Sequence, residues 1–183
     1  MRNVVITGTS RGIGFELAQQ FANNGHNVLA LSRNDKPLKA VNHKNIHTLS
    51  VNLAVDSDIH KVKSFIKDNW KTVDILINNA GKASLNHSIL TPSETVKDLF
   101  ETNYLGTFLF SRECSKHMIK KKWGRIINFS TIAVSLDLEG EMVYASSKSA
   151  IEKMSRIMSK ELSTYNITIN TLGPTPVYTD LIK

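Results

Sequence analysis

Near its start the chain reads Thr7-Gly8-Thr9-Ser10-Arg11-Gly12-Ile13-Gly14, directly after an apolar run and before the amphipathic segment Phe15–Asn23. Apolar residues recur in that segment at helical spacing, and Gly25 closes it. We expect a strand, a tight turn and a helix. Gly8 permits a sharp exit from the strand, Gly12 permits close backbone approach to a pyrophosphate, and Gly14 permits close packing of the helix. A purely structural turn is the alternative interpretation, because three residues separate Gly8 from Gly12, unlike the G-x-G-x-x-G pattern.

The rest of the chain alternates strand-like and helix-like segments. Predicted strands cover Asn3–Thr7, Val28–Leu31, Ile46–Val51, Asp74–Ile77, Arg125–Phe129 and Ile167–Leu172. Predicted helices cover Phe15–Asn23, Asp58–Trp70, part of Pro92–Lys120, and Val143–Leu162. This alternation predicts an α/β fold with a doubly wound parallel sheet, formed by residues 1–183 as a single domain.

Composition narrows the functional classes. The 183 residues contain one cysteine, Cys114, which excludes an internal disulfide and a thiol-based metal cluster and suits a reducing compartment. No apolar stretch reaches the roughly 18 residues that a membrane helix needs. We therefore expect a cytoplasmic protein with no membrane partner and no metal. The net charge is +7, but the lysines are dispersed apart from Lys120–Lys122, and no aromatic residues alternate with them. This pattern favours a solvated surface over a nucleic-acid interface, which remains the least favoured hypothesis.

A second candidate motif is Tyr144-Ala145-Ser146-Ser147-Lys148, which places a phenol and an ammonium one helical turn apart. A phenol has an ordinary pKa near 10. An ammonium about 4 Å away would stabilise the phenolate by roughly 4 kcal/mol at an effective dielectric near 20. The pair therefore predicts a Tyr144 pKa near 7, suited to proton transfer. Without further motifs, two surface neighbours would be the favoured interpretation of this spacing.

Taken in order, Thr7–Gly14, Asn78-Asn79-Ala80-Gly81, Asn103 and Tyr144-x-x-x-Lys148 resemble the motifs of the short-chain dehydrogenase/reductases. The chain is similar to the 3-oxoacyl-carrier-protein reductases and related carbonyl reductases over almost its whole length. The resemblance implies a Rossmann fold that binds a nicotinamide cofactor at the carboxyl ends of the strands. It also implies a small-molecule carbonyl substrate and a homo-oligomer, a dimer or a tetramer.

Within this resemblance, charge predicts the choice of cofactor. Relatives that prefer NAD carry an aspartate at the end of the second strand, where this chain has Ser32 followed by Arg33. Arg11 supplies a second cation inside the glycine-rich turn, so we expect NADP(H) to be preferred over NAD(H), although both arginines could instead simply face solvent. Asn52 replaces the aspartate that usually contacts adenine. The predicted cofactor-binding residues are Gly8, Thr9, Ser10, Arg11, Gly12, Ile13, Gly14, Ser32, Arg33, Asn52, Leu53, Asn79, Ala80, Gly81, Lys148, Pro174, Val177 and Thr179.

The resemblance also implies the catalytic residues. Tyr144 is the general acid, and Lys148 holds the nicotinamide ribose. The family's substrate-polarising serine lies thirteen residues before the tyrosine, where this chain has Thr131, and Ser130 is the alternative if the turn shifts by one residue. Asn103 matches the asparagine that supports a proton-relay water, and a helix asparagine bonded to backbone is its alternative role.

The end of the sequence departs from the family pattern. Thr175 stands where a glycine usually follows Pro174, and the chain ends at Lys183. Family members continue through a substrate lid and a seventh strand, so six strands are expected here. The sequence thus predicts an NADPH-dependent enzyme that reduces a ketone, an aldehyde or a 3-oxoacyl group to an alcohol. A catalytically weak NADP-binding regulatory or interaction protein is the alternative.

Overall fold

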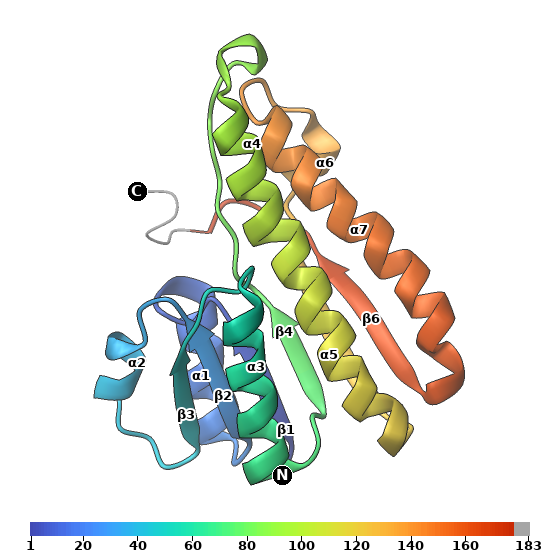
Figure 1. Cartoon of the computed structure of the whole chain (residues 1–183). Helices are drawn as coiled ribbons and strands as arrows, with labels where there is room; N and C mark the ends of the chain where they lie inside the picture. The colour runs from blue at the N-terminus through green and yellow to red at the C-terminus, as the bar shows by residue number, and fades with distance from the viewer. Residues whose placement is uncertain (178–183) are drawn as a thin grey trace.

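A parallel sheet of six strands forms the centre of the computed structural model, which describes residues 1–177 (Figure 1). The strands are β1 (Asn3–Thr7), β2 (Asn27–Ser32), β3 (Ile46–Ser50), β4 (Ile75–Asn78), β5 (Gly124–Phe129) and β6 (Ile167–Leu172). Their order across the sheet is β3-β2-β1-β4-β5-β6. The predicted Rossmann-type α/β fold and its six strands are confirmed.

Helical segments connect the strands. They are α1 (Gly12–Asn23), α2 (Lys36–Ala40), α3 (Asp56–Phe65), η1 (Ile66–Trp70), η2 (Ser88–Leu90), α4 (Ser93–Leu99), η3 (Phe100–Leu105), α5 (Gly106–Lys121), α6 (Ala133–Leu136), α7 (Met142–Leu162) and η4 (Ser163–Tyr165). The segments η1 and η3 are π-helical. Since η3 directly joins α4 to α5, these three segments form one continuous helical run that is wider in the middle. No helix within residues 1–177 is both long and apolar enough to cross a membrane.

Two apolar clusters cover the two faces of the sheet. One joins β1, β2, β4, β5 and β6 to α3 and α5, with Phe110, Met118 and Ile126 almost completely buried. Cys114 lies in this cluster, and burial raises the pKa of its thiol to about 12. The other cluster joins α1 to β1, β2 and β4. Strands β1 and β2 are thus buried on both faces, as their uninterrupted apolar sequences predict.

Strands β5 and β6 are covered mainly on one face. In β5 the buried residues Gly124, Ile126 and Asn128 alternate with partly exposed ones, and in β6 Ile167 and Ile169 alternate with exposed polar residues. Helices α5 and α7 pack against the buried face. The covered face therefore holds α7 close to the end of β5.

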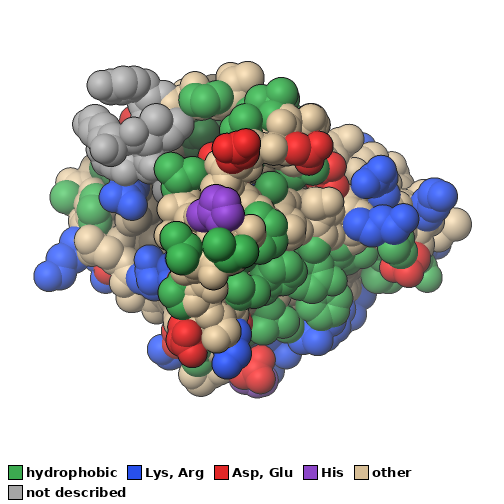
Figure 2. Space-filling view, turned by 90° about the horizontal axis from the view of Figure 1, so that it is seen from above, with side chains coloured by type: hydrophobic (Ala, Val, Ile, Leu, Met, Phe, Trp, Pro, Cys, Tyr) green, Lys and Arg blue, Asp and Glu red, His purple; other side chains and the backbone are tan. Residues whose placement is uncertain are grey.

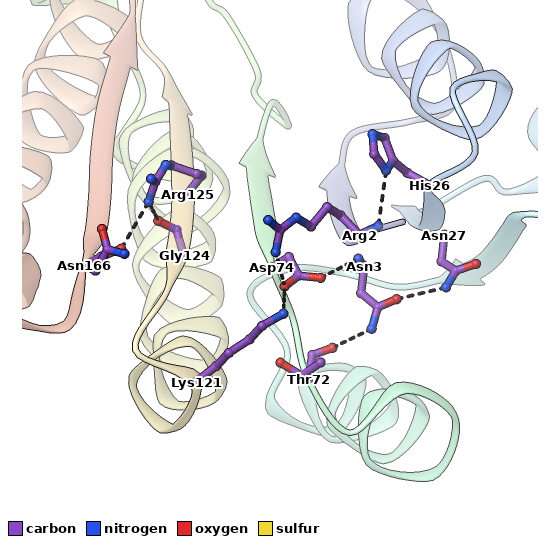
Figure 3. A network of polar contacts seen from close by, with 10 residues as sticks. All are labelled: Arg2, Asn3, His26, Asn27, Thr72, Asp74, Lys121, Gly124, Arg125 and Asn166. Atoms are coloured by element: carbon purple, nitrogen blue, oxygen red, sulfur yellow. Dashed lines mark hydrogen bonds and ion pairs between the residues drawn. The ribbon is translucent and has the colours of Figure 1, made fainter.

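The amino-terminal edge of the sheet is tied together by Asp74 (Figure 3). Its carboxylate accepts a hydrogen bond from the Asn3 backbone N–H at 2.8 Å, pairs with Lys121, and lies 3.6 Å from the Arg2 guanidinium. Burial raises the pKa of this carboxyl, but the bonds from Lys121 and Asn3 and the nearby positive charges lower it, so the pKa lies below its ordinary value. Asp74 therefore links β1, β4 and the end of α5.

We expect Asp74→Asn to lower the free energy of unfolding at pH 7 by about 2 kcal/mol, because it weakens charge-assisted hydrogen bonds. The lowered pKa means that the carboxylate stabilises the fold fully above its ordinary value of 3.8, and that this stabilisation is lost as pH falls through the folded pKa. Urea unfolding at pH 7 and pH 3 measures the free energy of unfolding of Asp74→Asn and of the unmodified protein. The difference between the two proteins should be smaller at pH 3 than at pH 7. Asp68→Asn, at an exposed position, is the control, and an Asp74→Asn gap of equal size at both pH values contradicts the prediction.

Candidate functional site

The glycine-rich turn lies against the end of β4. Gly8 has a φ of 73°, and a Cβ atom there would lie 2.6 Å from the Ala80 Cα. The Asn79 side-chain amide donates to the carbonyls of Thr7 at 3.1 Å and Gly8 at 3.0 Å. The turn is thereby fixed at the point where β1 separates β2 from β4 and the strand order reverses, which is where open α/β sheets bind ligands.

A cleft of about 690 Å³ opens beside this turn. Twelve of the residues predicted to bind the cofactor line it: Gly8, Ser10, Arg11, Gly12, Ile13, Ser32, Arg33, Asn52, Leu53, Asn79, Ala80 and Gly81. They come from the ends of β1, β2 and β4 and from the segment after β3. The carboxyl ends of parallel strands meet at one edge of a sheet, so residues far apart in sequence converge there.

Five other residues predicted to bind the cofactor are described and lie outside the lining of the cleft; one of them is Lys148, and the others are Thr9, Gly14, Pro174 and Val177. Thr9 is buried, and its backbone N–H donates to the Leu31 carbonyl at 3.3 Å. Gly14 packs behind the turn, where a Cβ would lie 2.4 Å from the Gly8 carbonyl oxygen. The Pro174 carbonyl accepts a hydrogen bond from the Ile132 N–H at 3.2 Å, and Val177 is exposed. The last predicted residue, Thr179, lies outside the described residues.

The cleft fits a dinucleotide phosphate. Within the described residues, no side chain caps the amino terminus of α1, so its first amides are available to an anion. The first turn of α1 contains no acidic residue, and the exposed Arg11 precedes it. Gly8 and Gly12 both have positive φ values, which lets the backbone come close to a bound group.

The end of β2 carries a cation instead of a carboxylate. The Ser32 hydroxyl donates to the Asn34 carbonyl at 2.8 Å, and Arg33 is exposed beside the cleft. Asn52 was predicted to contact the cofactor, but its side-chain oxygen already accepts a hydrogen bond from the Ala54 N–H at 3.3 Å. Its own backbone N–H donates to Asp58 at 2.8 Å.

Asn103 and Lys148 meet around Gly81. A Cβ on Gly81 would lie 3.1 Å from the Lys148 Nζ and 3.4 Å from the Asn103 Oδ1. Asn103, fully buried in the π-helical segment η3, accepts from the Lys82 N–H at 2.8 Å and donates to the Lys82 carbonyl and the Ser147 hydroxyl, both at 2.9 Å. This side chain fixes the segment after β4 against α7.

Lys148 was predicted to lower the pKa of Tyr144, but it is not among the groups that shift this pKa. Its Nζ donates to the Phe129 carbonyl at 2.8 Å, and burial lowers the pKa of Lys148 to about 8. Burial raises the pKa of the Tyr144 phenol and is the largest effect on it; the nearby Thr131 side chain lowers this pKa, and the Glu141 charge raises it. The predicted Tyr144 pKa near 7 is therefore wrong for this structure, because burial is the largest effect on this pKa and no ammonium within residues 1–177 lowers it. The phenol stays protonated at neutral pH, which is the form that donates a proton.

The two candidate hydroxyls after β5 point to different partners. Thr131 is near enough to Tyr144 to lower the pKa of the phenol, and its Oγ1 accepts from the Ala133 N–H at 3.3 Å. Ser130 is almost completely buried, and its hydroxyl donates to the Glu152 carboxylate at 2.6 Å. The structure thus brings Thr131, and not Ser130, together with the phenol.

The sequence analysis missed several features around the site. Lys82 and Asp98 form an ion pair and both line the cleft. The position of Lys82 directly after Gly81 was the available signal, whereas Asp98 gave none. Apolar side chains also gather on the face of the molecule that is seen from above in Figure 2, where they are green. We define this apolar surface by its exposed members Leu85, Ile89, Leu90, Leu136, Leu138 and Met142. The surface is formed by two segments of the chain, residues 85–90 and residues 136–142. A hydrogen bond from the Asn86 N–H to the Gly140 carbonyl at 2.8 Å joins them.

Comparison with known proteins identifies the class to which this fold and site belong. The family model described as short chain dehydrogenase matches residues 2–183. The chain belongs to this family of oxidoreductases, which bind a nicotinamide cofactor.

Named relatives share about a third of the sequence. An NAD-dependent glycerol dehydrogenase of Listeria innocua is 32% identical over 182 residues, which are 98% of this chain and 72% of the relative. The 3-oxoacyl-(acyl-carrier-protein) reductase FabG of Aquifex aeolicus is 30% identical over 188 residues, covering 97% of this chain and 74% of the relative. Among solved structures, ElxO with NADP bound has a TM-score of 0.92 and 27% identity, covering 100% of this chain and 77% of ElxO.

Proposed function

We propose that this protein reduces a carbonyl group to an alcohol with NADPH. The observation that carries the proposal is the arrangement of Thr131, a protonated Tyr144 and Lys148 near a cleft that Arg11 and Arg33 flank. When bound, NADPH supplies the hydride to the carbonyl carbon.

The chain's own residues supply the proton and orient the substrate. The Tyr144 phenol donates its proton to the carbonyl oxygen as negative charge develops there. The Thr131 hydroxyl stands beside it and donates a hydrogen bond to the same oxygen. Lys148, held by the Phe129 carbonyl at 2.8 Å, lies next to Gly81 at the inner end of the cleft and would contact the ribose. Asn103 keeps Lys82 and Ser147 in place around that position.

The apolar surface supports a substrate with an alkyl or acyl chain. Met142 and Leu138 precede Tyr144 closely in sequence, and Gly140 packs against Leu85. Burial of a chain against these side chains would contribute roughly 25 cal/mol per Å². The FabG relatives act, by their name, on 3-oxoacyl groups, whereas the Listeria relative is named for glycerol. We therefore favour a 3-oxoacyl group or a similar ketone over a polyol-derived substrate.

The proposed preference for NADPH rests on two arginines that line the cleft, Arg33 directly after β2 and Arg11 directly before α1. A 2′-phosphate placed there would form charge-assisted hydrogen bonds with either guanidinium. The bound NADP of ElxO supports this choice, and the NAD-dependent relative argues for testing it directly.

We expect Arg33→Asp to weaken NADPH binding by at least about tenfold and to strengthen NADH binding, because a carboxylate repels the 2′-phosphate and accepts from the ribose hydroxyl. Titration of purified protein with each nucleotide, followed by nucleotide fluorescence, measures both dissociation constants. Arg156→Asp, at an exposed position on α7, is the matched control. Equal affinities of the unmodified protein for NADPH and NADH would overturn the proposed preference.

The predictions of a homo-oligomer, of a cytoplasmic location, of one domain, and of no nucleic-acid or membrane partner stay predictions.

A further inference from the structure

Helix α7 contacts three consecutive residues at the end of β5 through side chains. The three hydrogen bonds are Asn128 Nδ2 to Ser155 Oγ at 2.8 Å, Lys148 Nζ to the Phe129 carbonyl at 2.8 Å, and Ser130 Oγ to Glu152 Oε1 at 2.6 Å. They bind the end of the strand to the helix that carries Tyr144. The residue that follows them is Thr131.

Of the three hydrogen bonds, the one between Ser130 and Glu152 involves the residue directly before Thr131 in the chain. Ser130 is 3% exposed, and its hydroxyl donates to a carboxylate, which makes a short and strong type of hydrogen bond. On the other side, the Ser130 backbone N–H donates to the Leu172 carbonyl of β6 at 2.7 Å. Ser130 is therefore held from two directions, by α7 and by β6.

Helical geometry places Glu152 in line with the proposed catalytic side chains. Tyr144, Lys148 and Glu152 are spaced four residues apart on α7, so they share one face of the helix. Arg156, one turn further on, donates to the Glu152 backbone carbonyl at 3.4 Å, whereas the Glu152 carboxylate accepts from the Ser130 hydroxyl. The same face of α7 thus carries the Tyr144 phenol and, two turns further on, the Glu152 carboxylate, which binds Ser130 next to Thr131.

We propose that Glu152 is a positioning residue that acts through Ser130 to hold the Thr131 hydroxyl against Tyr144. Its catalytic consequence rests on the proposed function. Loss of the carboxylate frees the buried Ser130 hydroxyl and lets the turn shift. A displacement of about 1 Å in a reacting group can cost on the order of 100-fold in rate.

The first test measures NADPH consumption with ethyl acetoacetate as the probe. We expect Glu152→Ala and Ser130→Ala to lower kcat by about 10- to 100-fold while KM for the ketone and the affinity for NADPH stay within about threefold. Glu152→Gln keeps an acceptor oxygen and should restore most of kcat. In a Thr131→Ala background, Glu152→Ala should lower kcat no further, because the group that it positions is gone.

Ser155→Ala is the matched control. It removes the corresponding bond to Asn128, two residues earlier on β5, and it should lower stability while leaving kcat unchanged. Equal losses of kcat in Ser155→Ala and Glu152→Ala would show a general effect of helix–strand packing and would overturn the proposal. So would additive losses in the double variant with Thr131→Ala.

A second test does not depend on turnover. The ¹³Cζ signal of labelled tyrosine, assigned to Tyr144 by its loss in Tyr144→Phe, reports the polar surroundings of the phenol, to which the Thr131 hydroxyl contributes. Glu152→Ala, Ser130→Ala and Thr131→Ala should shift this signal in the same direction, and Ser155→Ala should leave it in place. A Tyr144 signal that moves in Thr131→Ala but not in Glu152→Ala or Ser130→Ala overturns the positioning role. An unmodified protein that reduces no carbonyl, but shows the expected shifts, contradicts the proposed function and leaves the positioning of Thr131 supported.

Discussion

Tyr144→Phe should lower kcat for carbonyl reduction by about 10²- to 10⁴-fold, the usual contribution of a positioned general acid. In the proposed reaction the phenol is the proton donor, and with its pKa raised by burial it carries its proton at neutral pH. Tyr144 is not among the residues that line the cleft, so the affinity for NADPH should change little. Steady-state assays with NADPH and ethyl acetoacetate, together with nucleotide titration, measure both quantities.

Tyr165→Phe is the control, since this tyrosine lies in η4, beyond the far end of α7, and is exposed. A Tyr144→Phe protein with unchanged turnover would remove the phenol from the reaction. If the unmodified protein binds NADPH tightly but reduces no carbonyl, the alternative of a nucleotide-binding regulatory protein gains support.

Gly14→Ala should destabilise the fold by about 1–3 kcal/mol and weaken NADPH binding by about tenfold or more. Alanine usually stabilises a helix relative to glycine, so the sign is diagnostic. Here the added Cβ would lie 2.4 Å from both the Gly8 carbonyl oxygen and the Asn79 Nδ2. Neither neighbour can move freely, because the Asn79 amide already holds the turn through Thr7 and Gly8.

Urea unfolding and nucleotide titration measure the two effects of Gly14→Ala. Gln20→Ala, at an exposed position of the same helix, should leave both almost unchanged. A stabilised Gly14→Ala protein with normal affinity would mean that the turn relaxes without cost, and that the close packing of Gly14 has no part in shaping the cleft.

The fold was predictable because its signals are local. Strand β4 was predicted at Asp74–Ile77 and lies at Ile75–Asn78, since a short apolar run bounded by polar residues marks a buried strand. The helix predicted at Asp58–Trp70 begins at Asp56 and ends in the π-helical η1. Neither π-helical segment has a comparable local signal, so the widened helix around Asn103 could not be predicted.

The sequence predicted which residues meet at the candidate site better than it predicted their hydrogen bonds and pKa shifts. The spacing of Tyr144 and Lys148 places them on one helix face, but it does not show where a flexible lysine ends. In the structure the lysine reaches the Phe129 carbonyl, nineteen residues earlier in the chain. Likewise, two adjacent hydroxyls at Ser130 and Thr131 look equivalent in sequence, and only the position of Glu152 separates them.

The place of β1 in the sheet determines the order in which the molecule can fold. This strand precedes the other described strands in the chain yet lies in the interior of the sheet, with Asn3 beside Asn27 on one side and Val4 beside Ile75 on the other. The first pairing closes a short loop, whereas the second must wait until a much longer segment has been synthesised, and longer closures cost more entropy and slow folding. During translation, β1 therefore passes through a stage in which one side is paired and the other is bare. The nucleotide cleft, which needs both Gly8 and Ala80, forms only after that stage ends.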